Sequence, residues 1–252
     1  MKKNKKGIKA AILIIGDEIL SGRTQDLNVS FLSNWLNTNC GISTGEVRVI
    51  PDIEKIIIKN TLDLSKNFNY VFTTGGIGPT HDDITSKSIS KAFKVKYEYH
   101  KEAYSILEKY YGKVKFNKGR KKMAKMPKGS FLILNPSSAA PGFKIKNVFC
   151  LPGIPSILKG MIENSKKYLL KGDITLSAAI NLRTVESSIA TELEKIQKKY
   201  LKKIKIGSYP FFRMGAIGVS VVMRSTIKSN LASCKNAIIT MAKRKKIKIF
   251  KV

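Results

Sequence analysis

Cysteine is scarce in this chain of 252 residues. The three cysteines, Cys40, Cys150 and Cys234, are odd in number, lie far apart and form no C-x-x-C pair. This spacing argues against the disulfide framework of a small secreted protein and against a structural zinc site. We therefore expect reduced thiols and a cytoplasmic protein.

Long apolar runs are missing as well. No stretch approaches the roughly 18 apolar residues of a membrane span, so we expect no membrane association. Lysines near the N-terminus precede the apolar run Ala10–Ile15, a faint likeness to a signal peptide. The run is too short, however, and Asp17 and Glu18 follow it at once. A buried first strand is the better interpretation.

Acidic residues are few, with 17 against 47 basic residues and a net charge of +30. A surface this basic attracts phosphates, so nucleic acid has to be considered as a partner. Only seven of the basic residues are arginine, the residue suited to bidentate contacts, and the lysines are spread along the whole chain. Two interpretations stay open, a general lysine-rich bias and a polyanion-binding surface, and the first is favoured.

Strand and helix patterns alternate over the first two thirds of the chain. Short apolar runs predict strands, and 3.6-residue periodicity predicts helices between them. The expected strands are 10–15, 47–50, 70–73, 131–134 and 144–151, and the expected helices are 28–38, 53–64, 83–93, 100–111, 118–125 and one from Pro155. This alternation is typical of an α/β fold with a mostly parallel sheet and helices on both faces.

The pattern changes at Lys171-Gly172-Asp173. Beyond this point we predict strands at 174–180, 204–206, 216–224 and 246–251, with helices at 184–199 and 228–243. The β-α-β-β-α-β order is that of a small α+β domain. The predicted domains are therefore 1–171 and 172–252.

The strongest local signal is the segment Gly75-Gly76-Ile77-Gly78-Pro79-Thr80, between an expected buried strand and a helix. Glycines let the backbone approach a ligand and point N–H groups at it, and the N-terminus of a helix favours phosphate. The alternative is a tight turn whose Asp82 or Asp83 caps the helix. The pattern matches neither G-x-G-x-x-G nor the P-loop.

Carboxylates gather after the first three expected strands. Six of the 17 acidic residues lie there: Asp17, Glu18, Asp26, Asp52, Asp82 and Asp83. The carboxyl ends of parallel strands share one edge of the sheet, where ligands bind. Several carboxylates beside a phosphate turn are the arrangement that holds a divalent metal ion against a pyrophosphate. Alternatively, residues such as Asp26 are helix caps or solvated.

Arg120 and Lys121 could reach phosphate, or they could equally belong to a solvated basic face. Two further polar residues are also ambiguous. Asn28 either caps the helix at 28–38 or binds the ligand, and we include it among the substrate-binding candidates. His81 could act as an acid or a donor, although an isolated loop histidine is more often a hydrogen-bonding surface residue.

Four separated motifs carry a family resemblance. They are Gly16–Gly22 with Gln25–Asn28, Thr74–Thr85, Asn135-Pro136 with Ala140–Phe143, and Leu151–Pro155. In this order they resemble the MoaB/Mog (molybdopterin-binding-domain) family, in particular the N-terminal domains of competence/damage-inducible protein A and of eukaryotic FAD synthase. The likeness covers about residues 8–170, and Gly207–Pro210 extends the FAD-synthase likeness more weakly.

The resemblance implies a three-layer α/β fold of the MoaB/Mog type. In the molybdenum-cofactor enzymes of the family, two aspartates that match Asp52 and Asp83 assist adenylyl transfer to molybdopterin. In the proteins most similar to this chain, the site is associated with metal-dependent hydrolysis of dinucleotide pyrophosphates such as FAD or ADP-ribose. The resemblance makes Asp83 a metal ligand or orienting group and the Gly75–Thr80 turn the phosphate site.

Metal-dependent hydrolysis of a nucleotide pyrophosphate is our leading hypothesis, with Asp52 and Asp83 as catalytic residues. We expect a divalent metal ion (magnesium, manganese or cobalt) with Asp83 and Asp26 as its ligands. The expected partner is a phosphorylated nucleotide or pterin, and we expect a homo-oligomer, as in related proteins. These 252 residues hold no counterpart of the amidase or FAD-forming domains of longer relatives, so those activities are not expected.

Two alternatives are kept. The first is molybdopterin binding or adenylyl transfer in molybdenum-cofactor synthesis. The second is a nucleic-acid-binding module, suggested by the charge and by Gly215-Ala216-Ile217-Gly218. A KH loop joins two helices, whereas this one precedes a strand, so a strand-end turn is favoured and nucleic acid is an unlikely partner.

Overall fold

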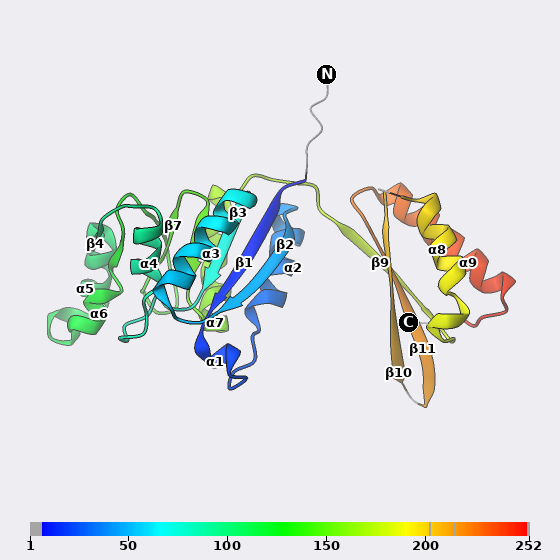
Figure 1. Ribbon diagram of the computed structural model, residues 1–252, viewed down its shortest axis with the longest axis horizontal. Coiled ribbons are helices and arrows are strands. Elements are labelled where there is room, and N and C mark those ends of the chain that lie inside the picture. The colour runs from blue at the N-terminus through cyan, green and yellow to red at the C-terminus, as the bar shows by residue number, and fades with distance from the viewer. Residues whose placement is uncertain (1–6, 202, 214, 251–252) are drawn as a thin grey trace, which may run out of the picture. The chain divides into compact units, whose positions relative to one another are not determined.

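The computed structural model describes residues 7–201, 203–213 and 215–250 and forms two compact units, Met1–Gly172 and Asp173–Val252 (Figure 1). The sequence places the division one residue earlier. Each unit has its own hydrophobic core.

A six-stranded sheet in the order β2-β1-β3-β8-β7-β6 forms the centre of the first unit (Figure 1). Neighbours from β2 to β8 run parallel, whereas β7 and β6 are antiparallel additions. The strands are β1 Lys9–Ile15, β2 Ser43–Ile50, β3 Tyr70–Thr74, β6 Phe131–Ile133, β7 Gly142–Ile145 and β8 Val148–Leu151. The predicted mostly parallel α/β fold is confirmed.

Helices cover both faces of this sheet and make three layers (Figure 1). One face packs against α2 (Asn28–Cys40) and α7 (Pro155–Met161), the other against α3 (Glu54–Asn67), α4 (Thr85–Ala92) and α5 (Lys101–Lys115). Successive residues of β1 enter the two cores alternately because side chains alternate along a strand, so the whole apolar run is buried.

Shorter elements complete the unit. They are α1 Asp17–Leu20, α6 Lys118–Lys122, the 3-10 helix η1 Ile162–Tyr168, and β4 Tyr97–Tyr99 paired with β5 Lys125–Pro127 in a separate two-stranded sheet. Neither α1 nor β4 nor β5 was predicted, because α1 is only one turn long and the two strands contain no continuous apolar run like the one that indicates β6.

The predicted single strand 144–151 is wrong. It is the antiparallel hairpin β7–β8, whose turn holds Lys146 at a φ of 49°. The Asn147 amide anchors this turn by donating to the carbonyls of Ser65 and Phe68 at 2.9 and 3.0 Å. A left-handed residue inside an apolar run reverses the chain without interrupting the hydrophobic pattern.

The second unit is a three-stranded antiparallel sheet, β10-β11-β9, with its core shared with two helices. The elements are β9 Leu176–Leu182, η2 Glu186–Ser188, α8 Ala190–Lys199, β10 Lys205–Arg213, β11 Ala216–Ser225 and α9 Lys228–Arg244. The small α+β domain is confirmed, but the predicted strand 246–251 is only a bridge between Ile249 and Leu182, and residue 251 lies outside the described residues.

The Gly215–Gly218 segment belongs to the β10–β11 hairpin, with Gly215 at a φ of 72°. The strand-end interpretation is therefore confirmed. Within the described part of the chain, every helix is too short or too polar to span a bilayer.

Candidate functional site

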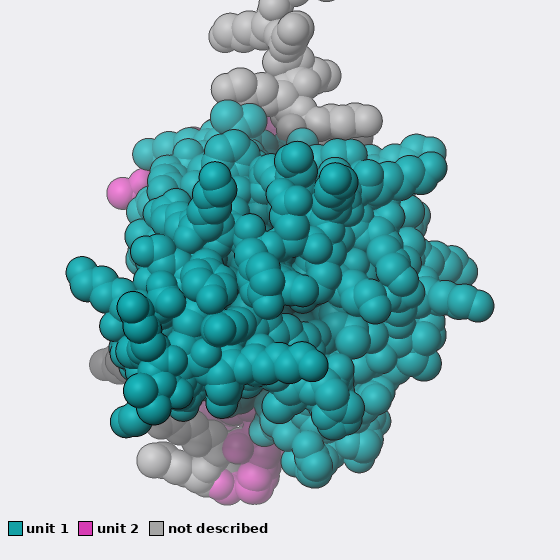
Figure 2. All heavy atoms as spheres, turned by 90° about the vertical axis from the view of Figure 1, so that its left-hand side faces the viewer, with its two compact units in different colours: residues 1–172 teal, residues 173–252 magenta. Residues whose placement is uncertain are grey.

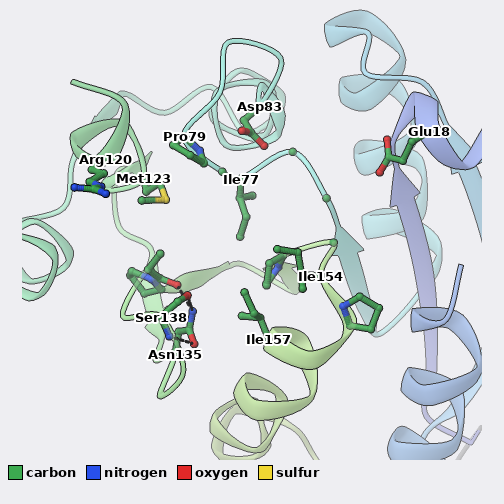
Figure 3. A pocket seen from close by; sticks show the side chains of 18 of the residues that line it. Glu18, Ile77, Pro79, Asp83, Arg120, Met123, Asn135, Ser138, Ile154 and Ile157 are labelled. Carbon is green, nitrogen blue, oxygen red and sulfur yellow. Dashed lines mark hydrogen bonds between the residues drawn. The ribbon is translucent and has the colours of Figure 1, made fainter. Parts of the chain in front are cut away.

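A pocket of about 720 Å³ lies at the carboxyl edge of the parallel strands. Here the chain leaves β3 and β8 into Gly75 and Pro152-Gly153, and the Gly75 N–H donates to the Leu151 carbonyl at 3.1 Å. The pocket is lined by Glu18, Thr24, Gly75–Pro79, Asp83, Tyr111, Arg120, Met123, Asn135, Ser138, Ala140, Pro141, Pro152–Pro155 and Ile157 (Figure 3). This is the sheet edge at which the sequence predicts a ligand.

The first two glycines of the turn are required by its geometry. Gly75 and Gly76 have φ angles of 99° and 69°, in the region that favours glycine. A Cβ on Gly75 would lie 2.1 Å from the carbonyl oxygen of Ile15, and one on Gly76 would lie 2.1 Å from Oγ1 of Thr85. The turn is thus pressed against β1 and the start of α4, and its backbone faces the pocket.

Asp83 braces the same turn. Its Oδ2 accepts from the Thr80 N–H at 2.8 Å and from the Thr80 hydroxyl. α4 begins two residues later, at Thr85, so the alternative in which Asp83 caps the helix is not observed. The Thr80 carbonyl in turn accepts from the Lys122 ammonium. His81 is almost fully exposed, as expected for a surface histidine.

Asp52 lies directly after β2, and its Oδ2 accepts from the Asp17 N–H at 3.1 Å. Burial raises the pKa of the Asp52 carboxyl, and repulsion from Asp17, Glu18 and Asp82 adds to the effect, although the backbone hydrogen bond opposes it. These four carboxylates therefore lie close enough to repel one another. A bound cation would relieve their mutual repulsion.

The side chains of Asp26 and Asn28 both make hydrogen bonds within the protein. Asp26 Oδ1 accepts from the Val29 N–H at 2.9 Å, a helix-capping contact of the kind considered as an alternative. Asn28 is 4% exposed and donates through Nδ2 to the Gly153 carbonyl at 2.7 Å, so it fixes a loop that lines the pocket. Neither residue lines the pocket itself.

The metal set of Asp83 and Asp26 stays a prediction. Across the described ranges, no group of three histidine, cysteine or acidic side chains is placed to hold a metal ion. Magnesium, however, is commonly held by one or two carboxylates, with substrate phosphates and water completing its shell. Asp83 lines the pocket at the turn and is a carboxylate of the kind that such a cation uses.

The sequence indicates little of the rest of the pocket, where Arg120 was a candidate only as a residue that could reach phosphate. Arg120 and Met123 lie on one side of the pocket, at and just after α6, and Ile154 and Ile157 lie on the other side, in the chain after β8 (Figure 3). Tyr111 of α5 also belongs to the lining. The Asn135 side chain organises the loop between β6 and β7 through bonds with Ser138 and Ala140. The Asn135 and Leu151–Pro155 motifs signalled two of these segments, whereas Tyr111 carried no local signal.

The predicted residues thus separate into two groups. Gly75, Gly76, Gly78, Pro79 and Asp83 meet in one pocket. Thr80, Asn28, Asp26 and Asp52 lie around it, where they brace loops or place charge behind it.

Comparisons with known proteins agree with this geometry. Residues 11–172 match the family described as "Probable molybdopterin binding domain", and residues 175–251 match "FAD synthase, middle domain". A protein from Archaeoglobus fulgidus is 32% identical over 79% of this chain and 84% of its own length. Among solved structures, CinA of Thermoplasma acidophilum, a protein of unknown function, is 29% identical with a TM-score of 0.60, covering 64% of this chain and 98% of its own. MoaB from Thermus is more distant, at 15% identity and a TM-score of 0.45 over 64% of this chain and 91% of its own.

Proposed function

This chain belongs to the family of the probable molybdopterin binding domain, and we propose that its pocket binds a phosphorylated nucleotide and hydrolyses a pyrophosphate bond, as in FAD or ADP-ribose. The observation that carries the proposal is that Asp83 and a glycine turn, whose first two residues have positive φ angles, lie in one pocket. Such turns bind phosphate because their backbone N–H groups donate hydrogen bonds to its oxygens.

The reaction needs only water as a second reactant. The water oxygen bonds to one phosphorus atom while the bond from that phosphorus to the bridging oxygen breaks. FAD then gives AMP and FMN, ADP-ribose gives AMP and ribose 5-phosphate, and the protons released pass to solvent or to a neighbouring carboxylate.

Each group has a separate task in this proposal. The Gly75–Thr80 turn holds a phosphate, and Asp83 keeps the turn closed through Thr80. Asp52, with its raised pKa, is suited to accept a proton near the turn. A divalent cation held by Asp83 and Asp26, or by the carboxylates around Asp52, would neutralise phosphate oxygens and polarise the phosphorus.

The test is product analysis of wild type and three variants with FAD, ADP-ribose and NAD, each with magnesium, manganese or cobalt. Asp83→Asn and Asp52→Asn keep the hydrogen-bond acceptors for Thr80 and Asp17 but lose the charge. Asp173→Asn, at an exposed residue of the second unit, is the matched control. We expect metal-stimulated AMP release from wild type and Asp173→Asn, and about 100-fold slower release from the other two. Absence of AMP release from wild type with every substrate refutes the proposal.

Pterin binding is the second candidate, and the family description itself favours it. Native mass spectrometry of the purified protein distinguishes the two. A retained pterin phosphate, together with no AMP release, would assign the pocket to molybdopterin binding or adenylyl transfer.

A further inference from the structure

Helix α6 is attached to the glycine turn. Besides the bond from Lys122 to Thr80, the backbone at Gly119 lies so close to Pro79 that an added Cβ would be 3.3 Å from the Pro79 carbonyl oxygen. The Asn117 side chain caps the helix by accepting from the Arg120 N–H at 3.1 Å. Arg120 therefore has a fixed backbone position beside the phosphate turn.

The Arg120 side chain is held over an aromatic ring. Its guanidinium carbon lies 4.2 Å from the centre of the Tyr111 ring, and Nη1 donates to the Lys115 carbonyl at 2.5 Å. Tyr111 takes this position just before Gly112, whose φ of 71° breaks the path of α5. Both Tyr111 and Arg120 are half-buried and line the pocket.

Charge alone does not explain an arginine here. The chain has 40 lysines and seven arginines, and the next two residues, Lys121 and Lys122, lie outside the pocket lining. Arginine differs from lysine in its flat, delocalised and weakly hydrated cation, which stacks on aromatic planes. Apolar residues of the lining lie on this side, with Met123 next to Arg120 and Ile77 beyond Met123 (Figure 3).

We propose that Arg120 and Tyr111 form a subsite for the planar heteroaromatic ring of the ligand, with Arg120 as the specificity-determining residue. The inference rests on the phosphate site of the proposed function. The turn holds the phosphate, and the ring stacks on the guanidinium among Ile77, Met123 and Ile154. A nucleotide base and a pterin are both planar heteroaromatic rings that can stack in this way. A second phosphate group would gain nothing from the apolar wall, so a ring is the better occupant of the subsite.

The surface that carries the subsite is on the α5–α6 side of the first unit, the side that faces the viewer in Figure 2. Calorimetric titrations on the full chain with ADP, neopterin phosphate and inorganic pyrophosphate, each with magnesium, test the proposal. The variants are Arg120→Lys, which keeps the charge, and Arg120→Met, which removes it. Lys118→Met, at an exposed residue of α6 outside the pocket lining, is the matched charge control.

Both Arg120 variants should weaken the binding of at least one ring-bearing ligand about tenfold, as expected for a cation–π or stacking contact. The affinity of each Arg120 variant for pyrophosphate should be within about twofold of the affinity of Lys118→Met. The ligand that responds identifies the ring as a base or a pterin. Fluorescence of Trp35, the single tryptophan, checks that each variant is folded.

Three results would overturn the inference. They are wild-type affinity of Arg120→Lys for both ring-bearing ligands, equal losses for pyrophosphate and ADP in Arg120→Met, and a wild type that binds pyrophosphate but neither ring-bearing ligand. Failure of the proposed hydrolysis can be told apart from failure of the ring subsite. In the first case AMP release is absent but the binding differences between the variants remain.

Discussion

Replacing Gly75 by alanine gives the most direct test of the glycine turn. An alanine with positive φ costs about 1–2 kcal/mol. The new Cβ would also lie 2.1 Å from the Ile15 carbonyl oxygen, which belongs to a buried strand and cannot rotate away. Overpacking of this kind costs about 1–3 kcal/mol, so the total loss should be about 2–5 kcal/mol.

A matched control isolates the contact with Ile15. Gly129 has a φ of 82°, and an added Cβ would meet nothing within 4 Å, so Gly129→Ala carries only the conformational cost. The assay is urea unfolding followed by Trp35 fluorescence, since Trp35 is buried in α2 of the same unit. The reasoning is refuted if the two variants lose the same free energy of unfolding within about 0.5 kcal/mol.

Three further predictions follow from the surroundings of the site. Burial raises the pKa of Asp52, so its protonated form stabilises the fold fully below the unfolded value of 3.8, and this contribution is lost as pH rises through the folded pKa. As the pH rises from about 3.5 to 7, the free energy of unfolding of Asp52→Asn should therefore increase relative to that of wild type. Urea unfolding of both proteins at the two pH values measures this, and a difference between them that does not change with pH would contradict the assignment. Asn135→Ala removes four hydrogen bonds from the loop before β7 and should cost about 1–3 kcal/mol by the same assay, whereas a cost near zero would show that the loop holds without them. The buried Cys40, Cys150 and Cys234 have raised pKa values, that of Cys150 reaching about 12, so a thiol reagent near pH 8 should label them only after denaturation.

Local conformation explains why much of the site could be predicted. Gly75 and Gly76 occupy backbone angles that other residues rarely adopt, and the apolar run before them indicates a buried strand. Because β1, β2 and β3 run parallel, their carboxyl ends lie at the same edge of the sheet. The segments that follow these strands, with Asp52 and Asp83, therefore lie at this edge. Each of these steps depends on neighbours in sequence or on a general rule of topology.

Contacts between distant segments could not be predicted in this way. The role of Asp83 illustrates the limit, because the pattern allowed both a helix cap and a ligand, and only the path of the turn shows its carboxylate on Thr80. The β7–β8 hairpin was not predicted for the same reason. The chain reverses there because Lys146 has a positive φ angle and because the Asn147 side chain bonds to α3 and to the Phe68 carbonyl, which are distant in sequence.

The sequence by itself determined the α/β class, the small second domain, the glycine turn and the family, because periodicity, glycine conformation and motif order are properties of neighbouring residues. Only the tertiary structure showed which residues from distant segments line the pocket together with the glycine turn. Tyr111 and Arg120 lie more than 30 positions after the turn, and they reach it only because α6 packs on Pro79 and Thr80. Such packing depends on the shapes of both partners, which no single stretch of sequence contains.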